Sequence, residues 1–239
     1  MNKNCNGSKF FIQFNAFFNS MERGFYMVHA VIFDMDGVLI DTEKYLVKYW
    51  CQAAKELGFE MKREHALLIR SLAANFAEAK LKELLGEQFD YKAVRSRRKE
   101  LMSSHIKQYG LEKKRDVDQT LAYLKKKGYK TAVATASDFE RTKVYLEQIG
   151  IYEKFDKVVC ATMVQNGKPM PDIYLYACEQ IGEMPENCVA VEDSPNGVLS
   201  ASLAGLKTIM VPDLTKPDEE TKKRIYWQIE RLGDLTSLL

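Results

Sequence analysis

The sequence contains few of the residues that build disulfide or zinc frameworks. Its five cysteines are spread through 239 residues and form no C-x-x-C pair, so we expect reduced thiols and no disulfide network. Its three histidines, His29, His65 and His105, lie far apart and have no ligand spacing, which argues against a zinc site. A metal ion would therefore depend on carboxylate ligands, which favour a hard cation such as Mg²⁺.

Long apolar runs and a strong charge imbalance are also missing. The sequence has no stretch of about 18 apolar residues, so we expect no membrane-spanning helix. The formal net charge is only +2, which gives no reason to expect binding to nucleic acid. We therefore expect a cytoplasmic protein, a monomer or a weak dimer, that contacts neither nucleic acid nor a membrane.

The first 26 residues have a pattern of their own. Apolar residues recur there at helical spacing, with asparagines between them: Phe10, Phe11, Phe14, Phe17, Phe18 and Met21. The small-residue cleavage site of a signal peptide is not evident. We interpret residues 1–26 as an extension ahead of a natural start at Met27, either disordered or loosely helical.

From residue 28 onward, short apolar runs alternate with helical patterns. We expect strands at five places: residues 28–34, 130–134, 155–160, 188–191 and 206–211. Strands that alternate with helices of this length predict a Rossmann-like parallel α/β sheet. We assign residues 27–41 and 110–239 to this core.

The strand pattern is absent between residues 42 and 109, where four helical patterns follow one another. This segment predicts an all-helical cap inserted after the first strand, with hinges near residues 41–44 and 109–115. A basic run lies on its last helix: Arg95, Arg97, Arg98 and Lys99. We interpret this run as a solvated helix face.

Polar residues follow four of the expected strands, at the edge where open parallel sheets bind ligands. They are Asp34 and Asp36, then Thr135 and Ser137 on either side of Ala136, then Lys168, and finally Glu192 and Asp193. Asp34 and Asp36 are two residues apart in an extended segment, so their carboxylates can face the same point. Two such charges about 4 Å apart repel by roughly 4 kcal/mol at an effective dielectric constant of 20. The cluster therefore predicts a bound cation or a retained proton.

This combination of groups favours phosphoryl transfer. We expect Asp34 to attack phosphorus and form an aspartyl-phosphate, and Asp36 to act as general acid and then as general base. The main-chain and side-chain groups of residues 135–137 suit a phosphate, beside the fixed positive charge of Lys168. The candidate ligands of a magnesium ion are Asp34, Asp36, Glu192 and Asp193, with a main-chain carbonyl. Taken singly, each motif has a plainer interpretation as a helix cap, a turn or a surface lysine, and only their convergence favours a site.

The motifs at these positions resemble those of the haloacid dehalogenase superfamily, in the branch of β-phosphoglucomutase and related small-molecule phosphatases. The matching stretches read DMDGVLIDTE from Asp34, TAS from Thr135, GKPMPD from Gly167 and EDSPNG from Glu192. Their order and spacing fit from residue 27 to the C-terminus. The resemblance implies a mobile cap, a magnesium ion and the roles already given, with Glu192 acting on the metal directly or through water.

The resemblance leaves phosphatase and mutase to be decided. β-Phosphoglucomutases carry a histidine where this chain has Leu46, and tend to carry a lysine where it has Asp138. A mutase must protect its aspartyl-phosphate from water, whereas hydrolysis needs one water and a base, so the phosphatase is favoured. We expect a sugar phosphate as substrate, then a nucleoside monophosphate. A non-catalytic phosphometabolite-binding protein is the other alternative. Lys48, Arg70 and Asn75 are candidates for substrate selection, with a plain surface role equally open.

Overall fold

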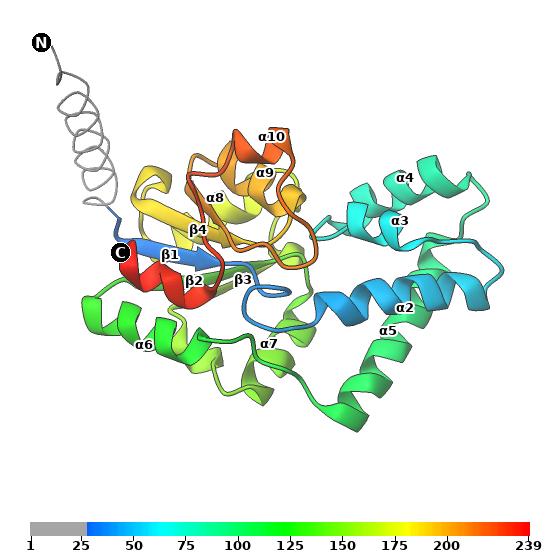
Figure 1. The fold of residues 1–239 in the computed structure, drawn as a ribbon, viewed down its shortest axis with the longest axis horizontal. Helices are drawn as coiled ribbons and strands as arrows, with labels where there is room; N and C mark the ends of the chain where they lie inside the picture. The colour runs from blue at the N-terminus through cyan, green and yellow to red at the C-terminus, as the bar shows by residue number, and fades with distance from the viewer. Residues whose placement is uncertain (1–27) are drawn as a thin grey trace, which may run out of the picture.

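The computed structural model describes residues 28–239, so the interpretation of residues 1–26 lies outside the described residues. Within them, six parallel strands form one sheet in the order β3-β2-β1-β4-β5-β6 (Figure 1). The strands are β1 (Ala30–Phe33), β2 (Lys130–Thr135), β3 (Lys157–Cys160), β4 (Cys188–Glu192), β5 (Lys207–Met210) and β6 (Trp227–Gln228). The chain runs outward from β1 to β3 and returns beside β1 as β4, which places the switch in strand order between β1 and β4.

β1 lies in the middle of the sheet and is buried on both faces, as its unbroken apolar sequence predicts. Val31 and Phe33 lie in one hydrophobic cluster, which includes residues of α6 (Val117–Lys127) and α7 (Phe139–Gln148). Ala30 and Ile32 lie in the other, with α8 (Asp172–Ile181) and α9 (Pro195–Leu203). The sheet is therefore the middle of three layers, with a short further helix, α10 (Glu219–Lys222), near α9 (Figure 1).

Local sequence explains where the core helices begin and end. In α6, Val117, Leu121 and Leu124 are buried on one face, and Gly128 ends the helix with φ 82° in the left-handed region. The helix α9 begins at Pro195 directly after Ser194, whose side chain accepts a hydrogen bond from the amide of Gly197. These ends fix the loops that leave the sheet at its carboxyl edge.

The segment between β1 and α6 forms a helical cap region, drawn in blue to green in Figure 1. Its helices are α2 (Glu43–Glu56), α3 (Arg63–Leu68), α4 (Ala74–Leu85) and α5 (Tyr91–Tyr109). They share a hydrophobic cluster of their own, which contains Val47, Trp50, Leu81 and Val94. The arrowhead of β1 points toward this region, so the carboxyl ends of the strands face the cap. The predicted α/β fold with a helical cap is confirmed, whereas the boundaries at residues 42 and 109 stay a prediction.

Two expectations are corrected by the structure. The sheet has a sixth strand, β6, which is only two residues long and carries no periodic pattern that a sequence could reveal. The solvated basic face on α5 is wrong for Arg98, which is only 8% exposed. Successive helical residues point about 100° apart, so Arg97 faces solvent and pairs with Glu56 while Arg98 turns inward.

Two other expectations concern cysteines and membranes. The four cysteines in the described part, Cys51, Cys160, Cys178 and Cys188, are free thiols. Among residues 28–239 we find no helix with the length and apolar character to cross a bilayer. The cytoplasmic location and the monomeric or weakly dimeric state stay predictions.

Candidate active site

A buried lysine joins the ends of β1 and β4. The Nζ atom of Lys168 donates hydrogen bonds to Asp34 Oδ1 and to Glu192 Oε1, each at 2.6 Å, and its side chain is fully buried. Tyr174 of α8 donates a further hydrogen bond from its hydroxyl to Glu192 Oε1 at 2.5 Å. A fully buried lysine needs such partners, since an unpaired charge in the interior is strongly unfavourable. Lys168 is therefore a fixed cation between two acids.

Burial dominates the protonation of these groups. It raises the pKa of Asp34 to about 7, although the attraction of Lys168 opposes the rise and the repulsion of Glu192 adds to it. For Lys168, burial lowers the pKa, but attraction to Asp34 and Glu192 outweighs it and leaves the pKa above its ordinary value. Lys168 thus remains charged, and an added cation would be needed to keep Asp34 fully ionised at neutral pH.

Asp36 faces a different set of partners. Arg141 of α7 donates to Asp36 Oδ1 at 2.6 Å, and the hydroxyl of Thr42 also donates to Oδ1. Ser137 donates to Asp36 Oδ2 at 3.3 Å and accepts a hydrogen bond from Arg141. The amide of Ser137 in turn donates to the hydroxyl of Thr135 at 3.2 Å. The loop after β2 and the loop after β1 are therefore tied together around the Asp36 carboxylate.

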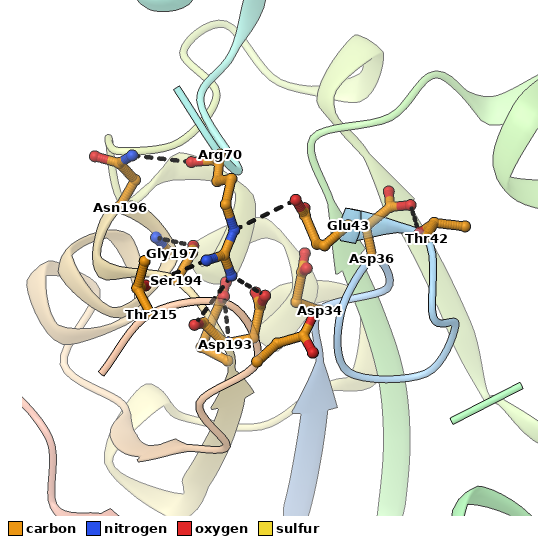
Figure 2. A network of polar contacts seen from close by, with 12 residues as sticks. Asp34, Asp36, Thr42, Glu43, Arg70, Asp193, Ser194, Asn196, Gly197 and Thr215 are labelled. Carbon is orange, nitrogen blue, oxygen red and sulfur yellow. Dashed lines mark hydrogen bonds and ion pairs between the residues drawn. The ribbon is translucent and has the colours of Figure 1, made fainter. Parts of the chain in front are cut away.

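An arginine of the cap, Arg70, reaches the carboxylate of Asp193 (Figure 2). Arg70 lies in the loop between α3 and α4 and forms an ion pair with the carboxylate of Asp193. Its Nε atom lies 3.3 Å from Glu43 Oε2, and its other nitrogens donate to the Asp193 carbonyl and to Thr215, both at 3.2 Å. Burial raises the pKa of Glu43 to about 8, against the attraction of Arg70, and also raises that of Asp193. The cap arginine is thus the cation that offsets these two buried acids.

The acids fit a hard divalent cation. One carboxylate oxygen from each of Asp34, Glu192 and Asp193 lies within 4.8 Å of the others. Asp193 Oδ1 is buried and makes no hydrogen bond to the described residues. Oxygen donors in such a group suit Mg²⁺. The side chain of Asp36 lies outside this group, so its predicted part as a metal ligand gains no support from the cluster.

The balance of charge agrees with that fit. Five acids are less than a tenth exposed at this edge: Asp34, Asp36, Glu43, Glu192 and Asp193. Three cations contact them, namely Lys168, Arg70 and Arg141. With every acid ionised, two negative charges are unmatched by direct contacts. A divalent cation would supply that charge.

Main-chain contacts hold the cap against the core. The amide of Ala73 donates to the carbonyl of Lys168 at 2.8 Å. The side chain of Asn196, after β4, donates to the carbonyls of Leu68 and Arg70 at 3.0 and 2.9 Å. The segments that follow β3 and β4 therefore both contact the cap, at the end of α3 and in the loop between α3 and α4.

Two glycines are needed where acids approach the backbone closely. Gly37 has φ 87°, and a Cβ there would overlap the Asp193 carboxylate. Gly197, in the first turn of α9, lies against the Glu192 carboxylate in the same way, without an unusual φ. The glycines of the DMDG and EDSPNG stretches thus make room for the acids.

The structure brings the predicted site residues together at one edge of the sheet. A cavity of about 100 Å³ reaches Asp34, Asp36 and residues 135–137, and it extends under the cap. Of the three cap candidates, Arg70 lies in the site, whereas Lys48 and Asn75 are exposed. No role was predicted for Thr42 and Glu43, which end the DMDGVLIDTE stretch, and Arg141 and Tyr174 were missed. Arg141 could have been predicted from the sequence. Asp138 caps α7, and the first turn of this helix, which contains Arg141, directly follows the loop after β2.

Comparison with known proteins gives a consistent result. The family model of the haloacid dehalogenase-like hydrolases matches residues 31–211. The phosphorylated carbohydrates phosphatase of Thermotoga maritima is 32% identical over 188 residues, which cover 76% of this chain and 84% of that protein. The β-phosphoglucomutase of Bacillus subtilis is 26% identical over 193 residues, covering 76% and 82%. The crystal structure of the Clostridium difficile β-phosphoglucomutase has the same fold, with a TM-score of 0.74 over 87% of this chain and 93% of that one, at 22% identity.

Proposed function

We propose that this chain, which belongs to the haloacid dehalogenase-like hydrolases and is a phosphohydrolase of that family, is a magnesium-dependent phosphatase of small phosphorylated metabolites. The observation that carries the proposal is the setting of Asp34. Its carboxylate is buried, held by Lys168 at 2.6 Å, and lies beside Glu192 and Asp193 at the cavity. A carboxylate fixed in this way is suited to act as a nucleophile.

In the first step an Asp34 oxygen forms a bond to phosphorus while the bond from phosphorus to the leaving oxygen breaks. Asp36 donates a proton to that oxygen. In the second step Asp36 takes a proton from water, whose oxygen attacks phosphorus and releases the Asp34 carboxylate. Bound at Asp34, Glu192 and Asp193, Mg²⁺ would supply positive charge next to the phosphate oxygens.

The remaining residues position the phosphate. Lys168 keeps a positive charge beside the nucleophile, and Ser137 with the main chain of residues 135–137 offers hydrogen-bond donors. Arg141 orients both Asp36 and Ser137. The cap over the site excludes bulk water, which strengthens each of these interactions.

Cavity size favours a compact substrate. The cavity of about 100 Å³ is well below the several hundred Å³ typical of pockets for drug-sized ligands. A sugar phosphate or a smaller phosphate ester suits it better than a nucleoside monophosphate. The name of the Thermotoga maritima relative, a phosphatase of phosphorylated carbohydrates, agrees with this choice.

Two side chains favour hydrolysis over mutase chemistry. Leu46 lines the cavity with an apolar group where a mutase carries histidine. Asp138 accepts a hydrogen bond from the amide of Arg141 at 3.0 Å as the N-cap of α7, and it adds no positive charge for a second phosphate. The mutase is the second candidate because of the likeness to the Bacillus subtilis enzyme.

The test is a panel of phosphorylated metabolites with the purified protein and MgCl₂, in which inorganic phosphate is measured. Wild-type protein is expected to release phosphate from at least one member, and Asp34→Asn from none. Conversion of glucose 1-phosphate to the 6-phosphate without phosphate release would support the mutase. Binding of the metabolites without turnover of either kind would support a non-catalytic binding protein.

A further inference from the structure

The cavity that reaches Asp34 and Asp36 has a second, basic part. It is lined by Arg95, Arg98 and Lys99 of α5, at the helical spacing that places three residues on one face. Lys99 lies 3.3 Å from the carboxylate of Asp138, so α5 reaches the loop that follows β2. Three of the four residues of the basic run thus face the same cavity as the proposed nucleophile.

Arg98 is the unusual member of this group. Its residue is only 8% exposed, yet its guanidinium makes no hydrogen bond or ion pair with any residue between 28 and 239. The Nε atom is fully buried without a partner, and the guanidinium carbon lies 5.2 Å from the centre of the Trp50 ring. Burial lowers the pKa of Arg98 to about 10; repulsion from Arg141 and Arg95 adds to this fall, and attraction to Tyr91 and Asp36 opposes it. The group is therefore still charged at neutral pH.

The other buried cations of the site are matched. Lys168 contacts two acids, Arg70 contacts two, and Arg141 contacts Asp36. Next to Arg98 in sequence, Arg97 is 41% exposed at its side chain and pairs with Glu56 and Glu100. A buried guanidinium without an acid is unfavourable, and ring contact with Trp50 offsets only part of the cost. The arrangement therefore leaves an open place for an anion.

That anion is not the phosphate that is transferred. Asp34, Lys168 and Ser137 surround the proposed reacting phosphate, and Arg98 contacts none of them. Arg98 lines the cavity from the cap helix α5, whereas those three residues belong to the core. A guanidinium matches carboxylate and phosphate oxygens with two parallel hydrogen bonds.

We propose that Arg98, supported by Arg95, binds a second anionic group of the substrate, and that the preferred substrates are compact phosphate esters carrying a carboxylate or a further phosphate. This inference rests on the proposed function, because it identifies the substrate class of the same cavity. Trp50 holds the guanidinium in place, and Arg95, half-buried and without an ion pair to the described residues, adds a second positive charge.

The test compares matched ligands that differ in the second charge. One pair is 3-phosphoglycerate and glycerol 3-phosphate, and the other is propane-1,3-diol bisphosphate and 3-hydroxypropyl phosphate. Dissociation constants are measured by calorimetry in an Asp34→Asn background, in which no turnover is expected. The doubly anionic member of at least one pair is expected to bind about tenfold tighter or more, as charge-assisted hydrogen bonds imply. The two pairs distinguish a carboxylate from a phosphate as the preferred group.

Adding Arg98→Gln should reduce that preference to within about twofold, and Arg98→Lys should keep an intermediate preference. Arg97→Gln is the matched control, since it removes a neighbouring arginine that faces solvent, and it should keep the full preference. Should Arg98→Gln fail to fold, Arg95→Gln gives a second measurement, with a preference reduced about threefold. Equal binding within both pairs, or a preference that Arg98→Gln leaves unchanged, overturns the proposal.

The outcome is separable from that of the proposed function. Phosphate release by wild-type protein with no preference for the doubly anionic ligands would overturn the second anion site and leave the phosphatase. Preferential binding that depends on Arg98, without any phosphate release, would support the second anion site and overturn the phosphatase.

Discussion

The guanidinium of Arg70, from the loop between α3 and α4, is in ion-pair contact with the carboxylate of Asp193, which follows β4. The cap therefore places a cation directly on an acid of the proposed metal group (Figure 2). Because Asp193 also has an oxygen without a hydrogen-bond partner, the arginine neutralises the site only in part. If Asp193 binds a metal ion as proposed, this one carboxylate would link the position of the cap to metal occupancy.

Replacing Arg70 should destabilise the metal-free protein. Arg70→Met removes the partner of two buried acids, Asp193 and Glu43, and breaking a buried pair costs on the order of 3–5 kcal/mol. Urea unfolding in the presence of EDTA measures the loss, and excess MgCl₂ should restore part of it. Arg97→Met, which removes an exposed pair with Glu56, should have little effect. An unchanged unfolding midpoint for Arg70→Met in EDTA would show that the acids do not depend on this arginine.

Lys168 should be needed for turnover. Lys168→Met leaves Asp34 and Glu192 without the cation that they share at 2.6 Å, and it removes a positive charge from the phosphate site. We expect kcat to fall by about 100-fold or more, as for other fixed groups that stabilise a transition state. The exposed Lys143 provides the control as Lys143→Met. A Lys168→Met enzyme with more than a tenth of wild-type kcat would contradict this role.

Glu43 should make the stability of the metal-free protein depend on pH. Its pKa rises from an ordinary 4.5 to about 8 in the folded protein, so the folded state binds the proton more tightly than the unfolded chain. Stability should then be lost as pH rises between these values. Glu43→Gln lacks this loss, so its stability relative to wild type should increase from pH 4.5 to 8, by an amount on the order of 4–5 kcal/mol.

Unfolding in EDTA at a series of pH values measures that difference. Glu56→Gln is the control. A hydrogen bond from Arg97 lowers the pKa of Glu56, so the stability of Glu56→Gln relative to wild type should fall as pH rises. A difference between Glu43→Gln and wild type that does not change with pH would mean that Glu43 ionises equally in both states.

Gly197 should be intolerant of a methyl group. Alanine favours a helix by about 1 kcal/mol relative to glycine, but a Cβ at Gly197 would overlap the Glu192 carboxylate. Gly197→Ala should therefore displace Glu192 and lower phosphatase activity by about tenfold or more, with weaker binding of Mg²⁺ in calorimetry. The exposed Leu203 on the same helix gives the control Leu203→Ala. Normal Mg²⁺ binding by Gly197→Ala would show that Glu192 does not need this space.

The sequence allowed the central strands and the strand-end residues to be predicted because both follow local rules. An unbroken apolar run predicts a buried strand such as β1, and parallel strands deliver their carboxyl ends to one edge. That is enough to bring Asp34, Lys168 and Asp193 to a common place. The short β6 follows no such rule, since two residues provide no periodicity.

The features that were missed depend on tertiary contacts. Arg98 belongs to a charged run that is typical of a solvated face, and only the folded arrangement of α5 shows that it lines the cavity beside Trp50. Arg70 is predicted only as a candidate for substrate selection, and its pairing with acids distant in sequence was missed. Tyr174 reaches Glu192 from another helix. Local patterns of charge and hydrophobicity carry no information about such partners.

The most direct test of the account is to trap the phosphorylated enzyme. Wild-type protein is mixed with MgCl₂ and a substrate from the panel, quenched in acid within the first turnover, and reduced with borohydride, which converts an aspartyl-phosphate to homoserine. Peptide mass spectrometry is expected to find homoserine at position 34 and at no other acid. Phosphate release that proceeds with Asp34 unmodified, or with the modification at another carboxylate, would contradict the central claim that Asp34 is the nucleophile.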